Sequence, residues 1–125
     1  MAENRNVLYL FGYSEMTGTH LERLLPILKA QINKGSQIGL VLIHDGVIGI
    51  NKKGKVPEKM EELLNMNINI YAMIPDLQAR GITLENIHDK VKPIGYDDLI
   101  DILDITPKII SVSYTHLTLP TILLV

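Results

Sequence analysis

His44 and Asp45 come nearest, by residue type and spacing, to a catalytic pattern in this chain. An imidazole beside a carboxylate can act as a general base and the group that orients it. Neighbouring residues of a strand point to opposite faces, so the two side chains pair directly only if the strand ends at His44. No companion nucleophile is evident. Two hypotheses stay open: a stand-alone enzyme that uses His44 and Asp45 on a small ligand, or a turn made by Asp45 and Gly46.

A basic segment follows, in which Lys52, Lys53 and Lys55 surround Gly54. Such a cluster could contact the phosphates of a nucleotide or of an RNA backbone. A charged loop can equally be solvated and nothing more. The glycine-bearing segment 12–18 lies where a phosphate-binding turn would follow a first strand, but it has neither GxGxxG nor Walker spacing. A nucleotide- or RNA-binding module is therefore a further hypothesis, which depends on the lysines alone.

Metal and thiol chemistry find no support in the sequence. None of the 125 residues is a cysteine, which excludes disulfides, thiolate metal sites and cysteine-borne catalysis within the chain. His20 and His88 lie far apart and lack the spacing of metal ligands. The formal net charge of −2 gives no global basic field that would point to nucleic acid. We therefore expect no metal, no cofactor and no catalytic residue in this chain.

The element that must position His44 is the apolar run before it. Residues 37–46 read QIGLVLIHDG, which predicts a strand buried on both faces in the middle of a parallel sheet. Ligands and partners meet such sheets at the carboxyl ends of the strands, where His44, Asp45 and Gly46 stand. Four more strands are expected, at 6–12, 68–74, 91–94 and 108–111. Pro93 places the fourth of the five at or near an edge.

Helical periodicity separates these strands. Apolar residues recur at spacings of three and four over 21–32, with Pro26 inside the stripe, and Gly35 is expected to end this helix. Further helices are predicted at 57–64, 75–81 and from Asp97 to Thr106, and a polar loop is predicted at 47–55. The alternation predicts an α/β fold, a three-layer α/β/α sandwich with a mostly parallel sheet of about five strands.

The last fourteen residues, VSYTHLTLPTILLV, differ from the rest, because they carry no acidic or basic residue apart from His116. Residues 112–121 match the in-frame translation of a transposase-type sequencing adapter, whose continuation gives Val125 and a stop. We therefore predict an α/β domain at 1–111, truncated at its C-terminus, and a non-native tail at 112–125. No signal peptide opens the chain and no apolar stretch reaches the roughly 20 residues of a membrane span, so we expect a cytoplasmic protein.

Three segments resemble the TusB/DsrH-like family. Residues 43–47, IHDGV, resemble its QDGV segment after the second strand. Residues 70–82, IYAMIPDLQARGI, resemble its VYAL-x-x-DL-x-ARG-[LI] segment, and residues 94–99, IGYDDL, resemble its I-D-Y-x-x-[FL] segment. Order and spacing agree over most of 7–111. The chain departs from the family in a longer first loop, in His44 where Gln is common, and in the loop of Lys52–Lys55.

The resemblance implies a DsrE/DsrF/DsrH-like fold, found in small α/β proteins that assemble as oligomers. It further implies a non-catalytic subunit of a cytoplasmic sulfur-relay complex with DsrE-like and DsrF-like (TusD/TusC-like) partners. Such complexes pass persulfide sulfur toward 2-thiouridine at the tRNA wobble position, or serve sulfur oxidation. In this family the persulfide-carrying cysteine that matters most belongs to the DsrE-like partner, so contact with tRNA or a sulfur carrier would be indirect.

A cysteine-free subunit can only shape, cover or orient the cysteine of a partner. On this hypothesis the partner interface consists of the strand-end residues and of a tyrosine and an ion pair further on, namely His44, Asp45, Gly46, Tyr71, Asp76 and Arg80. Tyr and Arg are enriched at interfaces. Asp76 and Arg80 stand at helical i,i+4 spacing and can equally pair only with each other.

Overall fold

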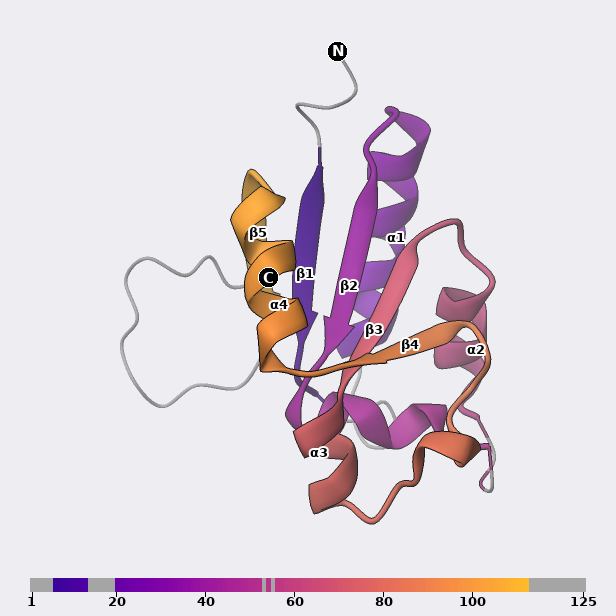
Figure 1. The fold of residues 1–125 in the computed structure, drawn as a ribbon. Coiled ribbons are helices and arrows are strands. Elements are labelled where there is room, and N and C mark those ends of the chain that lie inside the picture. The colour runs from indigo at the N-terminus through magenta and orange to yellow at the C-terminus, as the bar shows by residue number, and fades with distance from the viewer. Residues whose placement is uncertain (1–5, 14–19, 53, 55, 113–125) are drawn as a thin grey trace.

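Five parallel strands form one sheet in the computed structural model, which describes residues 6–13, 20–52, 54 and 56–112 (Figure 1). The strands are β1 (Val7–Phe11), β2 (Ile38–Leu42), β3 (Asn69–Met73), β4 (Val91–Ile94) and β5 (Lys108–Val112). Their order across the sheet is β4-β3-β2-β1-β5. The apolar run before His44 is therefore the central strand, as predicted, and Pro93 lies on an edge strand.

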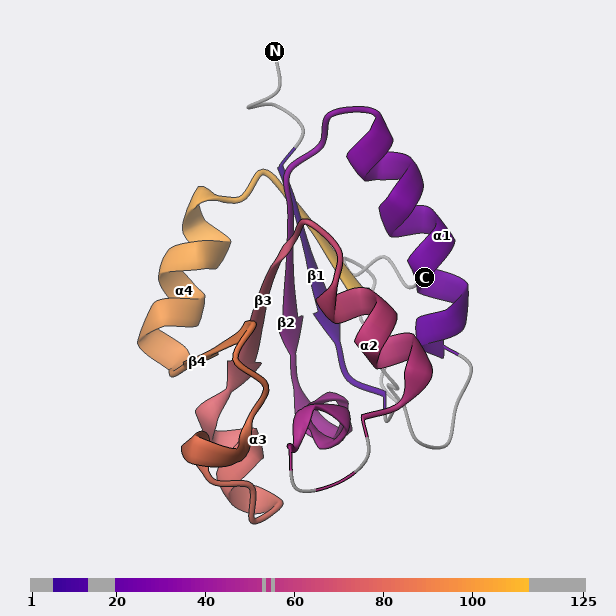
Figure 2. The same ribbon diagram turned by 90° about the vertical axis from the view of Figure 1, so that its right-hand side faces the viewer.

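Helices cover both faces of this sheet, which confirms the three-layer sandwich. Figure 2 shows α1 (His20–Asn33) and α2 (Glu58–Leu64) on one face and α4 (Tyr96–Ile105) on the other. Three short helices connect the remaining elements, namely the 3-10 helix η2 (His44–Ile50), α3 (Ile74–Ala79) and the 3-10 helix η3 (Leu84–Asn86). Both η2 and α3 begin within two residues of the strand they follow, so they cap the carboxyl edge of the sheet. No helix within the described ranges is long and apolar enough to cross a membrane.

The predicted apolar stripe of α1 faces the core. Leu21, Leu24, Leu25 and Leu28 are all buried, and Pro26 lies within the helix on its exposed side. Gly35 adopts a φ of 91° just after the helix, the left-handed conformation of a C-terminal glycine. The spacing of the leucines therefore predicted both the helix and its buried face.

The two faces of the sheet carry cores of different size. On the side of α1 and α2, a large buried cluster contains Tyr9, Phe11 and Leu40 together with the helix leucines. On the side of α4, the buried cluster consists of Leu8, Val41, Met73 and Ile94, one from each of the first four strands. Most of the burial that stabilises this domain thus lies under α1 and α2.

The chain leaves the central strand earlier than predicted, and the predicted polar loop at 47–55 is wrong. Strand β2 ends at Leu42, and residues 44–50 form η2. Val47 and Ile50 of η2 are fully buried in the large cluster, although glycines and lysines surround them in sequence. An isolated antiparallel bridge between Asn51 and Ile87 then holds the segment against the chain that leads to β4.

The predicted boundary at residue 111 falls one residue before the end of β5. Val112 pairs with Phe11 in the sheet and is buried. Residues 113–125, the rest of the predicted tail, lie outside the described part of the structure, as do Lys53 and Lys55. The division into a domain at 1–111 and a non-native tail at 112–125 stays a prediction.

Candidate functional site

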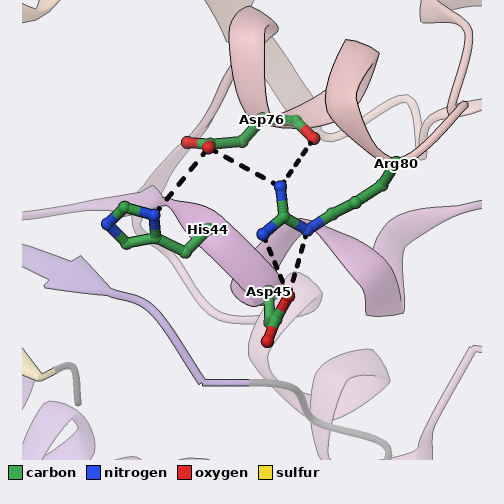
Figure 3. Close-up of polar contacts among 4 residues, drawn as sticks. All are labelled: His44, Asp45, Asp76 and Arg80. Atoms are coloured by element: carbon green, nitrogen blue, oxygen red, sulfur yellow. Dashed lines mark hydrogen bonds and ion pairs between the residues drawn. The ribbon is translucent and has the colours of Figure 1, made fainter.

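The carboxyl ends of β2 and β3 bring four polar side chains together (Figure 3). His44 and Asp45 begin η2, directly after β2, and Asp76 and Arg80 belong to α3 and its C-terminal cap, directly after β3. Because β2 and β3 are parallel neighbours, the segments that follow them emerge at the same edge of the sheet. We call these four residues the strand-end quartet.

Arg80 is the centre of the quartet. Its Nε and Nη2 donate hydrogen bonds of 3.1 Å and 3.0 Å to Oδ1 of Asp45. Its Nη1 donates a hydrogen bond of 3.1 Å to the backbone oxygen of Asp76 and lies 3.7 Å from Oδ1 of the same residue. The guanidinium therefore holds two carboxylates from two different elements in a fixed arrangement.

The imidazole of His44 stands at the open side of the quartet. Its Nδ1 lies 3.9 Å from Oδ1 of Asp76, and its side chain is 67% exposed. His44 also has a φ of 50°, the only positive φ among the non-glycine residues that the structure describes. Such a backbone conformation is costly for a residue with a Cβ and is often held in place at functional positions. With this φ the chain turns sharply from β2 into η2, and the imidazole of His44 points toward Asp76 of α3.

Gly46 allows this turn to lie against the end of β1. A Cβ added at Gly46 would lie 2.4 Å from the backbone oxygen of Phe11. The backbone nitrogen of Ile43 bonds to that same oxygen at 2.9 Å, and the nitrogen of Gly46 bonds back to the oxygen of Ile43 at 2.8 Å. Glycine at this position is therefore required by a close backbone approach, which fixes the start of η2 and with it the quartet.

The quartet carries two carboxylates and one guanidinium, so its net charge is −1 when the imidazole is neutral. The side chain of Asp45 is 59% exposed, and those of Arg80 and Asp76 are half-buried. Ion pairs this close to solvent add little to the free energy of unfolding, typically about 0–1 kcal/mol. The quartet is thus better suited to contacting another molecule at the surface than to holding the domain together.

The structure shows which of the side-chain pairings suggested by the sequence form at this site. Asp76, rather than Asp45, is the carboxylate beside His44, since Asp45 bonds to Arg80. The i,i+4 pair of Asp76 and Arg80 does form, but the hydrogen bonds of Arg80 to Asp45 join it to a second segment. Sequence reasoning missed this link between Asp45 and Arg80. The signal that could have found it is that adjacent parallel strands end at one edge.

Tyr71, also predicted to belong to the partner interface, lies elsewhere. It stands in the middle of β3, where it pairs in register with Val41 and Lys92, and it packs against the buried cluster under α4. Of the six predicted interface residues, the structure therefore brings four together as the quartet and places Gly46 beneath them, while Tyr71 faces α4.

Of the three lysines of the basic segment, the structure describes only Lys52, so the predicted phosphate or RNA contact stays a prediction. The Nζ of Lys52 lies 3.2 Å from Oδ1 of Asp89 in an ion pair at the surface. Among the described residues, no group of three or more His, Cys, Asp or Glu side chains could hold a metal ion. A hollow of about 450 Å³ lies at the amino ends of the strands, beside Ser36, Gln37 and Asn67, at the other end of the sheet from the quartet.

Comparisons with known proteins agree with the motifs. The family model described as DsrH like protein matches residues 14–109. The curated Protein TusB of Pectobacterium carotovorum is 35% identical over 78 residues, which cover 62% of this chain and 76% of that protein. Protein TusB of Pectobacterium atrosepticum is 38% identical over 63 residues, half of this chain and 62% of that protein. The stretch matched in the second relative is thus less than two thirds of its length.

Solved structures share the fold at low sequence identity. The ychN protein from E. coli superposes with a TM-score of 0.71 and 16% identity over 86% of this chain and 98% of that chain. A protein of unknown function, MTH1491 from Methanobacterium thermoautotrophicum, gives a TM-score of 0.66 and 15% identity over 86% and 97% of the two chains. These likenesses show that the arrangement of strands and helices is shared.

Proposed function

We propose that this chain, which belongs to the DsrH family, is a non-catalytic subunit of a cytoplasmic sulfur-relay complex. The relay would pass persulfide sulfur toward 2-thiouridine in tRNA. The partners would be a DsrE-like subunit, which supplies the persulfide-carrying cysteine, and a DsrF-like subunit. Both the similarity to proteins named TusB and the family motifs in 43–47 and 70–82 support this assignment.

The chemistry of the relay favours a supporting role for this chain. Persulfide transfer requires a thiolate that attacks the outer sulfur of a persulfide, and the departing group is again a thiolate. None of the 125 residues can form a thiolate, because none is a cysteine. The chain would therefore shape and cover the reacting cysteine of the DsrE-like subunit, and it would exclude water from it.

The observation that carries the proposal is the strand-end quartet. It presents a charged, preorganised and half-exposed surface at the edge of the sheet where α/β proteins meet their ligands. Arginine paired with carboxylates in fixed geometry is suited to partner contact, because little side-chain entropy is lost when the partner binds. We infer that the quartet, with Gly46 beneath it, faces the DsrE-like subunit.

Co-expression tests this proposal. The chain would be produced together with a DsrE-like and a DsrF-like protein, and the complex would be measured by size-exclusion chromatography with light scattering. We expect one stable assembly that contains all three chains and transfers persulfide sulfur, and we expect no turnover from this chain alone. Recovery of free monomer only, or sulfurtransferase activity of the isolated chain, would show that the proposal is wrong.

A matched pair of variants locates the contact. Asp45→Asn together with Arg80→Gln removes two of the three charges of the quartet, one of each sign, while keeping side chains of similar size. Glu61→Gln together with Lys59→Gln changes one residue of each charge on α2, away from the quartet. If the quartet faces the partner, the first pair weakens the complex and the second leaves it unchanged.

A further inference from the structure

Helix α4 covers the face of the sheet opposite α1 and α2, as Figure 2 shows. None of its ten residues is buried, whereas α1 buries four leucines and α2 buries three apolar side chains. A helix is about 10–12 Å wide, while five strands spaced about 4.8 Å apart extend over about 19 Å. The helix that faces the smaller core thus packs Leu99, Ile102 and Leu103 against it only partly buried, and its other side chains are exposed.

Large apolar side chains lie on the outer part of this helix. Tyr96 is 63% exposed and Ile100 is 61% exposed. They stand at i,i+4 spacing, so they are neighbours on one side of the helix, and Leu103 continues the same row toward the sheet. An aromatic and an aliphatic side chain this exposed, side by side, are typical of a contact surface.

A row of aspartates runs beside the apolar row. Asp97, Asp101 and Asp104 stand at i, i+4 and i+7 and are exposed, and no residue of α4 is basic. Among the residues that the structure describes, no ion pair involves any of the three. Asp101 and Asp104 lie in the C-terminal half of the helix, where the helix dipole disfavours negative charge. No basic side chain therefore pairs with this row within the described part of the domain, and the helix dipole favours only Asp97, in the first turn.

We propose that Tyr96, Asp97, Ile100, Asp101 and Asp104, the α4 face, dock a partner protein surface with an apolar centre flanked by Lys or Arg side chains. The negative charge of the α4 face predicts positive charge on the partner surface. The exposed Tyr96 and Ile100 would contact the apolar centre of that surface. A second copy of this chain fits poorly, because a two-fold contact would bring six aspartates together. This inference rests on the proposed function, which supplies the partner: a DsrE-like or DsrF-like subunit.

Charge reversal tests the α4 face in the co-expressed complex. The variant D97K/D101K/D104K places lysines on the helix, and those at 101 and 104 suit its C-terminal dipole, so the fold should be retained. The control E22K/E58K/E61K makes the same change of charge on α1 and α2, on the other face of the sheet. We expect the first variant to bind its partner at least about tenfold more weakly than wild type, and the control to bind as wild type does.

Site-specific crosslinking identifies the occupant, because the chain has no cysteine of its own. Ile100→Cys carries a maleimide-linked photocrosslinker on the α4 face, and Ile27→Cys carries it on α1, where Ile27 is partly exposed. Irradiation of the complex should join position 100 to a DsrE-like or DsrF-like subunit, near basic residues in the peptide found by mass spectrometry. Position 27 should give no such product.

The outcomes separate this inference from the proposed function. A wild-type chain that forms no complex overturns both. A complex that forms with wild type and equally with D97K/D101K/D104K overturns the α4 face alone, as does crosslinking of position 100 to a second copy of the same chain. Loss of the complex with the triple variant but not with its control supports the α4 face.

Discussion

Two nitrogens of Arg80 donate hydrogen bonds to the same carboxylate oxygen of Asp45, across 35 positions of the sequence. This contact joins the start of η2 to the cap of α3, and thus links the segments that leave two neighbouring strands. The contact forms only because β2 and β3 are neighbours in the sheet.

Replacing Arg80 by Lys should weaken the complex without unfolding the domain. A single ammonium group cannot bond to Asp45 and to the backbone of Asp76 in the geometry of the planar guanidinium. We expect the affinity for the relay partners to fall, with a loss of less than about 1 kcal/mol in the free energy of unfolding, because the ion pairs are near solvent. Arg23→Lys on the exposed side of α1 is the control, and equal binding by both variants would contradict the prediction.

His44 should be destabilising relative to glycine because of its backbone. Its φ of 50° costs about 1–2 kcal/mol for a residue with a Cβ. We expect His44→Gly to be about 1 kcal/mol more stable to urea than His44→Ala, since alanine keeps the strain and both variants lose the contact with Asp76. At an ordinary position the order would be reversed by about 0.5–1 kcal/mol. Equal binding of both variants and wild type to the partners would show that the imidazole is not used.

Gly46→Ala should destabilise the domain strongly. The new methyl group would lie 2.4 Å from the backbone oxygen of Phe11, and neither strand β1 nor η2 can move without breaking hydrogen bonds. Forced overpacking typically costs about 1–3 kcal/mol. In Gly54→Ala the nearest heavy atom would lie 3.9 Å away, an ordinary contact, so this control should change the midpoint of urea unfolding little.

The buried side of η2 can be tested with two neighbouring isoleucines. Ile50 is fully buried, whereas Ile48 is only half-buried. We expect Ile50→Ala to lower the free energy of unfolding by about 2–5 kcal/mol, the range for core isoleucines, and Ile48→Ala to lower it by clearly less. Similar, small losses from both would mean that this segment behaves as the surface loop that the sequence suggested.

The sequence predicted the layers of this protein well, because strand and helix periods are local properties. The spacing of the leucines of α1 and the apolar run of β2 each indicate, within a few residues of sequence, which side chains are buried. Helix η2 was mistaken for a polar loop because what buries Val47 and Ile50 is not local. The backbone of Phe11 and the bridge between Asn51 and Ile87 hold the segment in place, and both come from other parts of the chain.

The sequence predicted which residues make up the candidate site, but not the contacts between them. His44, Asp45, Asp76 and Arg80 stand out in the sequence because they follow strands, but pairing His44 with Asp76 requires β2 and β3 to be neighbours. The positive φ of His44 was not predicted, because such a φ is uncommon for any residue other than glycine, although histidine is among the types enriched there. Tyr71 was grouped with the quartet on residue type alone, which carries no information on which end of a strand a side chain occupies.

Stability should decline at alkaline pH in a way that depends on Tyr9. Burial raises the pKa of the Tyr9 hydroxyl, an effect larger than the opposing one of its hydrogen bond, in which the hydroxyl donates to Oε1 of Gln31 at 2.5 Å. Because the pKa is higher in the folded chain than in the unfolded chain, the neutral hydroxyl stabilises the fold fully below about pH 10. This contribution is lost as the pH rises above about 10 and passes through the raised pKa of Tyr9 in the folded chain. We expect Tyr9→Phe to lower stability at pH 7 by about 0.5–1.5 kcal/mol, for the lost hydrogen bond, and to flatten the decline above about pH 10. Urea unfolding at each pH, with Tyr96→Phe at an exposed position as the control, measures both effects. A decline as steep in Tyr9→Phe as in wild type would show that another group controls the alkaline limit.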